Sequence, residues 1–226
     1  MAIIVGFVSQ KGGVGKSTLA RALAVAASKA GLQVRLADLD FLQQTSTNWY
    51  WRRKNNEVEP QIDVRPFEKI KEALGLSDDV DLLIIDGPAR ATMETMRIVA
   101  AADFIVQPSN GHVDDLEPAV KVFHELVREG TPKTMLRIAL SRLGTPAEEK
   151  RAREYIAAAG YEVLDGAIYE RAAYGQAHDI GQSITETRYG SLNQQADKLI
   201  ESLLDAVTSA RAAEKTRVAA KTGAAA

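Results

Sequence analysis

The chain has 226 residues, of which 46% are hydrophobic and 26% are charged, the balance of a soluble globular protein. It contains no cysteine, which excludes disulfide scaffolds, thiolate zinc sites and conventional iron–sulfur clusters. The formal net charge of -2 gives no overall sign of nucleic-acid binding, so such binding requires a local basic patch.

Short apolar runs alternate with helical patterns along the chain. The run from Leu82 to Ile85 lies between two aspartates, as is typical of a strand covered on both faces of a parallel sheet. Alternating strands and helices predict an α/β fold with a mostly parallel central sheet flanked by helices. We expect strands at residues 3–8, 33–37, 62–65, 82–85, 104–106, 135–140 and 161–164. We expect helices at 16–30, 113–129, 146–159 and 192–207, and shorter ones within 41–55 and before residue 75.

The chain ends in an alanine-rich segment that carries four basic residues and one acid. Such a composition offers too little bulky apolar surface for a packed core. We therefore expect one domain at residues 1–209 and a disordered, mildly basic tail at 210–226.

The first expected strand leads into a glycine-rich loop that opens the first helix. The loop reads Gln-Lys-Gly-Gly-Val-Gly-Lys-Ser-Thr from Gln10 to Thr18. Its glycines let backbone N–H groups face phosphate oxygens, and the helix N-terminus adds partial positive charge. Lys16 is placed to reach the β- and γ-phosphates of a nucleoside triphosphate, and the Ser17 hydroxyl to bind Mg²⁺. The predicted nucleotide-binding residues of the loop are Gly12, Gly13, Val14, Gly15, Lys16, Ser17 and Thr18.

Aspartates follow two of the expected strands. Asp38 and Asp40 come at the end of the second strand, and Asp86 ends the run at 82–85. Each of these aspartates could also simply cap the end of a strand or the start of the next helix.

The loop departs from the standard phosphate-binding pattern, which has glycine where Gln10 stands. With Lys11 at its start, the run Lys-Gly-Gly-Val-Gly-Lys-Ser resembles the deviant Walker A motif of the ParA/MinD superfamily. Asp86 and the Gly-Pro after it resemble the Walker B segment of that family, and the resemblance implies Ser17, Asp40 and Asp86 as ligands of Mg²⁺. The resemblance covers about residues 1–208. It implies the three-layer P-loop NTPase fold and the small ParA form that lacks an N-terminal helix-turn-helix domain.

The resemblance also implies roles for single residues. Lys11 would contact the nucleotide of a second subunit, a cation supplied in trans as by an arginine finger. Asp40, which lies 24 residues after Lys16, would orient the attacking water. Pro108 and Arg142 match positions beside the nucleotide. The implied activity is hydrolysis of ATP with Mg²⁺, and Lys11, Lys16 and Asp40 are the implied catalytic residues.

Proteins of the ParA type bind double-stranded DNA as dimers, without sequence preference. The resemblance implies an ATP-dependent homodimer that is cytoplasmic and nucleoid-associated, makes no membrane contact and positions a plasmid, a chromosome or another cargo. A ParB-like or other centromere-binding or adaptor protein would stimulate its hydrolysis. The candidate DNA-binding residues are basic: Lys150, Arg151, Arg153, Arg188 and Lys198.

Two other functions remain alternatives. A MinD-like positioning ATPase needs a C-terminal amphipathic helix with bulky apolar residues, which the alanine-rich end of this chain matches poorly. A P-loop ligase of the dethiobiotin synthetase type needs a substrate motif that we do not find. Stimulation of ATP hydrolysis by DNA and a partner favours the partition function, whereas turnover of a small carboxylate favours the ligase.

Overall fold

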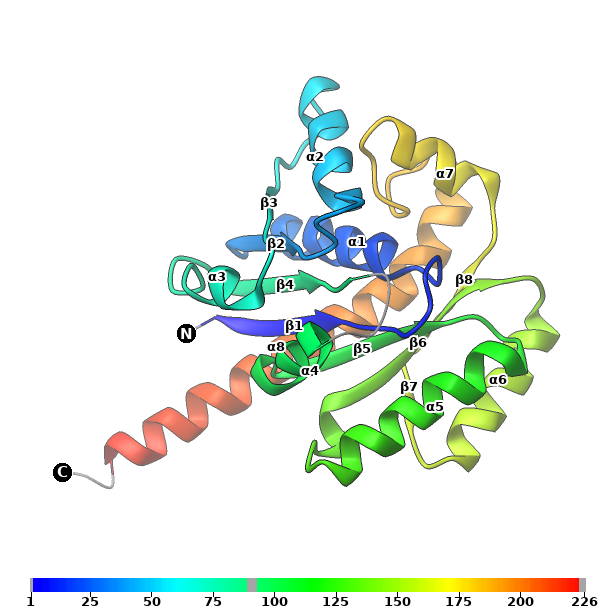
Figure 1. The fold of residues 1–226 in the computed structure, drawn as a ribbon. Coiled ribbons are helices and arrows are strands. Elements are labelled where there is room, and N and C mark those ends of the chain that lie inside the picture. The colour runs from blue at the N-terminus through cyan, green and yellow to red at the C-terminus, as the bar shows by residue number, and fades with distance from the viewer. Residues whose placement is uncertain (1, 89–92, 224–226) are drawn as a thin grey trace.

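A parallel β-sheet forms the centre of the protein, with helices on both of its faces (Figure 1). The computed structural model describes residues 2–88 and 93–223, with side chains described as far as residue 209. The strand order is β3-β2-β4-β1-β5-β6-β7, and β8 pairs with the end of β6. These strands are β1 (Ile3–Phe7), β2 (Val34–Asp38), β3 (Asp63–Pro66), β4 (Leu82–Asp86), β5 (Phe104–Ser109), β6 (Leu136–Leu143), β7 (Glu162–Val163) and β8 (Ile168–Tyr169). The predicted α/β fold is confirmed.

The helices bury an apolar core on each face of the sheet. One core contains residues of α1, α2, α7 and α8, and the other contains residues of α3, α4, α5 and α6. A 3-10 turn, Lys133–Met135, precedes β6. The bounds are α1 (Lys16–Lys29), α2 (Thr45–Asn55), α3 (Ile70–Leu74), α4 (Met93–Ala101), α5 (Val113–Arg128), α6 (Pro146–Ala158), α7 (Ala172–Asp179) and α8 (Gly190–Gly223).

The C-terminal helix extends further than the sequence pattern indicates. Where we expected a disordered tail from residue 210, the backbone continues as α8 to Gly223, and residues 224–226 lie outside the described residues. The segment is therefore helical in the structure, while its status as a separate tail stays a prediction. Within the described ranges, no helix combines the length and the apolar character needed to cross a bilayer.

The sheet brings the ends of three strands together at one edge. Strand β1 lies between β4 and β5, and in the register of the sheet Phe7 pairs with Asp86. Asp86 in turn pairs with Asp38 at the end of β2. The glycine-rich loop therefore starts beside two buried carboxylates.

Candidate nucleotide-binding site

The glycine-rich loop connects β1 to the N-terminus of α1. Gly15 precedes the first residue of α1 and has φ 109, a left-handed conformation that favours glycine. A Cβ on Gly15 would lie 2.6 Å from Oγ of Ser141, so the loop also packs too closely there for any side chain. The sequence thus has glycine where the backbone must turn toward the helix, as a phosphate-binding loop at a helix N-terminus requires.

The Lys16 side chain folds back across the loop. Its amine donates to the backbone carbonyl of Lys11 at 3.3 Å, and the residue is buried. Burial lowers the pKa of the Lys16 amine, and the negative charges of Asp86 and Asp40 oppose that shift. A buried cation over a turn of backbone amides is suited to binding phosphate.

The two strand-end aspartates are held by hydroxyl groups from α2. Oδ2 of Asp38 accepts from the backbone N–H of Thr47 at 2.8 Å and from its hydroxyl at 3.0 Å. Oδ2 of Asp86 accepts from the Ser46 hydroxyl at 2.7 Å. Burial and the charge of Asp38 raise the pKa of Asp86 to about 6. An ion pair with a cation would therefore favour the charged form of this carboxylate.

Magnesium fits the place beside Asp86. The Oδ1 atom of Asp86 is buried and makes no hydrogen bond. The Ser17 hydroxyl is close enough to lower the pKa of the Asp86 carboxyl. Among the described residues, no group of three acidic, histidine or cysteine side chains forms a metal cage. One carboxylate, a hydroxyl and the oxygens of a nucleotide form the kind of ligand set that Mg²⁺ takes in nucleotide sites.

Asp40 lies in the turn between β2 and α2. Its backbone N–H donates to Oδ1 of Asp38 at 3.2 Å, and its own Oδ1 accepts from the backbone of Gln43 at 3.3 Å. Asp40 and Gln43 both line a cleft of about 630 Å³ that also contains Lys16 and Ser17. The structure thus brings together the candidate water-orienting residue and the candidate phosphate-binding residues.

Arg142, near the end of β6, lines the same cleft and contacts the glycine-rich loop. Its guanidinium donates to the carbonyl of Gly13 at 2.7 Å and to Glu170 at 2.7 Å. Arg142 has φ 60, where β6 is irregular between Ser141 and Leu143. A left-handed conformation in a residue other than glycine is costly and tends to occur at functional sites.

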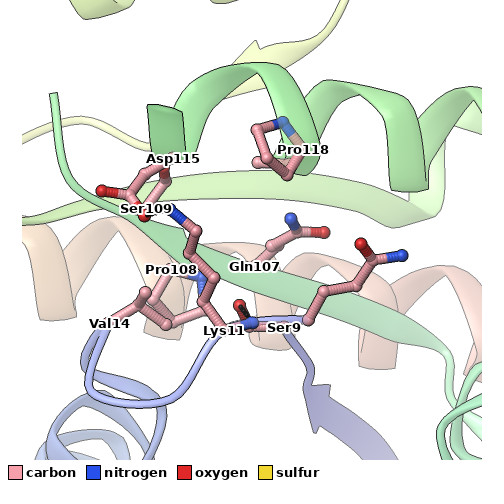
Figure 2. Close-up of a pocket in the computed structure, with 10 residues that line it drawn as sticks. Ser9, Lys11, Val14, Gln107, Pro108, Ser109, Asp115 and Pro118 are labelled. Carbon is pink, nitrogen blue, oxygen red and sulfur yellow. Dashed lines mark hydrogen bonds and ion pairs between the residues drawn. The ribbon is translucent and has the colours of Figure 1, made fainter. Parts of the chain in front are cut away.

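Lys11 lines a different hollow from the cleft. Figure 2 shows its side chain reaching from the loop to the first turn of α5, in a small hollow also lined by Val14 and Pro108. Its amine donates to the carbonyl of Asp114 at 2.6 Å and pairs with Oδ1 of Asp115 at 2.5 Å. The Lys11 side chain remains 44% exposed. Lys11 and Pro108 therefore line one hollow, and Lys16, Thr18 and Arg142 line the other.

The candidate DNA-binding residues lie in two regions. Lys150 and Arg151 are exposed on α6. The guanidinium of Arg153 donates hydrogen bonds to the backbone carbonyls of Leu164 and Gly166 and to the carboxylate of Glu149. Exposed Lys198 on α8 lies near enough to Glu149 to lower the pKa of that carboxyl. A second region holds exposed Arg188, which lines a hollow of about 170 Å³ with residues of α7.

Some polar residues of the site were not identified from the sequence. Arg21 and His178 line the cleft, and each has one buried nitrogen without a hydrogen-bond partner. Burial, together with the charges of Arg21 and Arg52, lowers the pKa of His178 to about 3, so this ring is neutral at pH 7. The only hint in the sequence is spacing, since Arg21 follows Ser17 by four residues and so shares its helix face.

Comparisons with known proteins identify the family of this chain. The family described as the CobQ/CobB/MinD/ParA nucleotide binding domain matches residues 5–184. An ATP-binding protein from Methanocaldococcus jannaschii is 27% identical over 162 residues, which are 58% of this chain and 61% of the relative. The chain thus matches about six tenths of the length of that curated relative.

Two solved structures share the fold. The septum site-determining protein MinD from Pyrococcus horikoshii, complexed with Mg-ADP, is 19% identical with a TM-score of 0.70, covering 90% of this chain and 96% of its own. Apo McdA from Cyanothece is 18% identical with a TM-score of 0.68, covering 90% of this chain and 100% of its own. Since the family match spans most of the chain, the protein belongs to the CobQ/CobB/MinD/ParA family of nucleotide-binding domains.

Proposed function

We propose that this protein is a ParA-type ATPase that uses MgATP to form a homodimer, to bind double-stranded DNA without sequence preference and to position a cargo. The observation that carries the proposal is the placement of two lysines of one loop in two different hollows. Lys16 is buried and lines the cleft, whereas Lys11 is half-exposed and lines a different hollow. A cation outside its own cleft is suited to act on a nucleotide held by another molecule.

The residues of the cleft would bind the triphosphate first. The N–H groups of the loop and the N-terminus of α1 face the phosphates, and Lys16 supplies a full positive charge. Burial makes the charged form of the Lys16 amine costly, so negative phosphate oxygens stabilise it. Arg142, fixed by Gly13 and Glu170, lines the same cleft.

Ser17 and Asp86 would hold the metal beside the phosphates. When bound, Mg²⁺ neutralises charge on the phosphate oxygens. Asp40 orients a water molecule toward the γ-phosphate from the turn in which its backbone is fixed. Lys11 of a second copy meets the same phosphate, and a cation supplied in this way is worth roughly 10³–10⁵ in rate in other NTPases.

Nucleotide binding would then control assembly. ATP bridges two copies through Lys11 and therefore binds the dimer better than the monomer, which shifts the population toward the dimer. Basic residues of the dimer contact DNA phosphates, so binding falls steeply with salt. The candidates remain Lys150, Arg151, Arg153, Arg188 and Lys198. A ParB-like or other adaptor protein would stimulate hydrolysis and so release the DNA.

Fluorescence anisotropy of a labelled DNA duplex tests the proposal. The full chain carrying Asp40→Ala should bind the duplex with MgATP, bind it far more weakly with MgADP, and lose binding as salt increases. The unmodified chain should release phosphate from ATP, faster with DNA present. Equal DNA binding with and without ATP, or no turnover of ATP, contradicts the proposal. Turnover only with a small carboxylate substrate indicates the ligase.

A further inference from the structure

A buried chain of hydrogen bonds connects α1 to the carboxylate of Asp86 through a serine. Ser46 lies in the first turn of α2 and is fully buried. Nε of Arg21 donates to its hydroxyl oxygen at 3.1 Å, and the hydroxyl donates to Oδ2 of Asp86 at 2.7 Å. Arg21 is itself only 3% exposed.

The directions of these hydrogen bonds are determined by chemistry. An arginine N–H can only donate, so the Ser46 oxygen must be the acceptor of the bond from Arg21. The single hydroxyl proton of Ser46 is then free to bind Oδ2 of Asp86. Oδ1 of Asp86 is left buried and without a hydrogen-bond partner. One oxygen of the carboxylate is thus fixed by the protein and the other is free for a ligand.

A purely structural explanation for these bonds is weak. The first turn of α2 is already attached to the sheet by Thr47, which makes two hydrogen bonds to Asp38. Ser46 therefore adds a second attachment, made to a carboxylate whose other oxygen is buried and has no hydrogen-bond partner. Burial lowers the pKa of the Arg21 guanidinium to about 10, and the nearby charges of Asp86 and Asp38 oppose that shift.

We propose that Ser46, held by Arg21, is a positioning residue that fixes Asp86 with Oδ1 toward magnesium and thereby sets the affinity of the nucleotide site for Mg²⁺. The inference rests on the proposed MgATP site but not on dimerisation or DNA binding. Ser46 acts through Asp86, as the outer partners of metal ligands do in other proteins. Loss of such a partner typically costs 10–100-fold in metal affinity.

Binding of a fluorescent ADP analogue, measured in EDTA and in excess magnesium, tests this inference without hydrolysis. For the unmodified chain, the ratio of the two dissociation constants gives the gain in affinity due to magnesium. Ser46→Ala should reduce this gain by about tenfold and leave the affinity in EDTA unchanged. Ser46→Thr, which keeps a hydroxyl, should restore most of the gain.

Thr47→Val is the matched control. It removes the neighbouring hydroxyl, which binds Asp38 instead of Asp86, and should leave the magnesium gain within about twofold. Arg21→Gln provides a second test should Ser46→Ala fail to fold, because it leaves both Ser46 and Asp86 in place. It should reduce the gain in the same direction.

The outcomes separate the inference from the proposed function. No binding of ADP by the unmodified chain would contradict the nucleotide site itself. Normal binding with an equal magnesium gain in Ser46→Ala and the unmodified chain would overturn the inference alone. An equal loss in Ser46→Ala and Thr47→Val would also overturn it, because the effect would then come from the attachment of α2.

Discussion

The amine of Lys11 lies 2.5 Å from Oδ1 of Asp115, so the lysine that we propose for a second subunit is held by its own chain. The same amine donates to the carbonyl of Asp114. Lys11 must give up both contacts before it reaches another molecule. Because its side chain is 44% exposed, the ion pair is worth at most about 1 kcal/mol.

Weakening this ion pair should favour the dimer. Asp115→Asn removes the negative charge, so MgATP should drive dimerisation at a lower protein concentration, by up to about thirtyfold, because the dimer releases two ion pairs of at most about 1 kcal/mol each. Sedimentation velocity across a protein dilution series measures this. Asp114→Asn is the matched control, because Asp114 contributes its backbone carbonyl to the contact. Dimerisation of Asp115→Asn at the same or a higher concentration would argue that the contact does not restrain Lys11.

Removal of the buried lysine should abolish nucleotide binding. Lys16→Ala deletes the cation over the loop, and the pocket then offers the phosphates the carboxylates of Asp86 and Asp40 without compensation. Calorimetric titration with ATP and Mg²⁺ should detect no binding. Lys11→Ala, which removes the half-exposed lysine, should still bind ADP as a monomer. ATP affinity in Lys16→Ala equal to that of the unmodified chain would refute the assignment of the loop.

Glu186 should contribute stability that is lost in acid. Burial alone would raise the pKa of its carboxyl, but hydrogen bonds from Arg53, from the backbone N–H of Ser183 and from Lys29 lower it to about 2. The pKa in the folded chain is thus below the ordinary value of 4.5. The stabilisation is therefore complete above pH 4.5 and disappears as the pH falls toward 2. It amounts to at most about 3 kcal/mol.

Urea unfolding at a series of pH values checks this contribution. Glu186→Gln should lower the free energy of unfolding by about 2–3 kcal/mol at pH 7 and make its decline between pH 4.5 and 2 shallower. Glu162→Gln is the control, because Glu162 pairs with Arg137 but is 67% exposed and should contribute less than about 1 kcal/mol. Equal effects of the two substitutions would contradict the role of Glu186.

Arg188 should contribute to DNA affinity if it lies in the DNA-binding surface. Arg188→Ala should weaken binding of the ATP-bound dimer to a duplex at fixed salt and lower the salt slope by about one. Its affinity for ATP should not change. Lys121→Ala removes another exposed positive charge, on α5, and should have little effect. Identical duplex binding by the Arg188 variant and the unmodified chain would remove this residue from the surface.

The sequence predicts the elements whose signal is local. Buried strands such as β4 are apolar runs bounded by aspartates, and α1 lies between a glycine-rich loop and Gly31. The structure adds α4, β8 and α7, which the sequence pattern did not reveal. β8 has only two residues, and α7 contains Gly175, so neither has the length or periodicity of a clear element.

The residues of the site likewise differ in whether a local sequence pattern identifies them. The glycine-rich loop is contiguous in the chain, so its residues can be identified from the sequence. Arg21 is a polar residue in the middle of a helix, a position that usually indicates solvent exposure. Arg21 is buried because β4 and α2 bring Asp86 and Ser46 close to it. These residues are far apart in the chain, so a local sequence pattern does not reveal their contact. The contact of Lys11 with Asp115 likewise spans more than a hundred residues of chain.

A mixing experiment tests most directly whether a cation from a second copy completes the site. Lys11→Ala and Asp40→Ala should each be inactive in ATP hydrolysis, since each lacks one catalytic group in both sites. A mixed dimer has one complete site, with Asp40 from one copy and Lys11 from the other. Mixing equal amounts before adding MgATP should therefore restore about a quarter of the unmodified rate, because half of the dimers are mixed and each has one active site. A rate no higher than the sum of the separate variants would show that Lys11 does not act across the dimer.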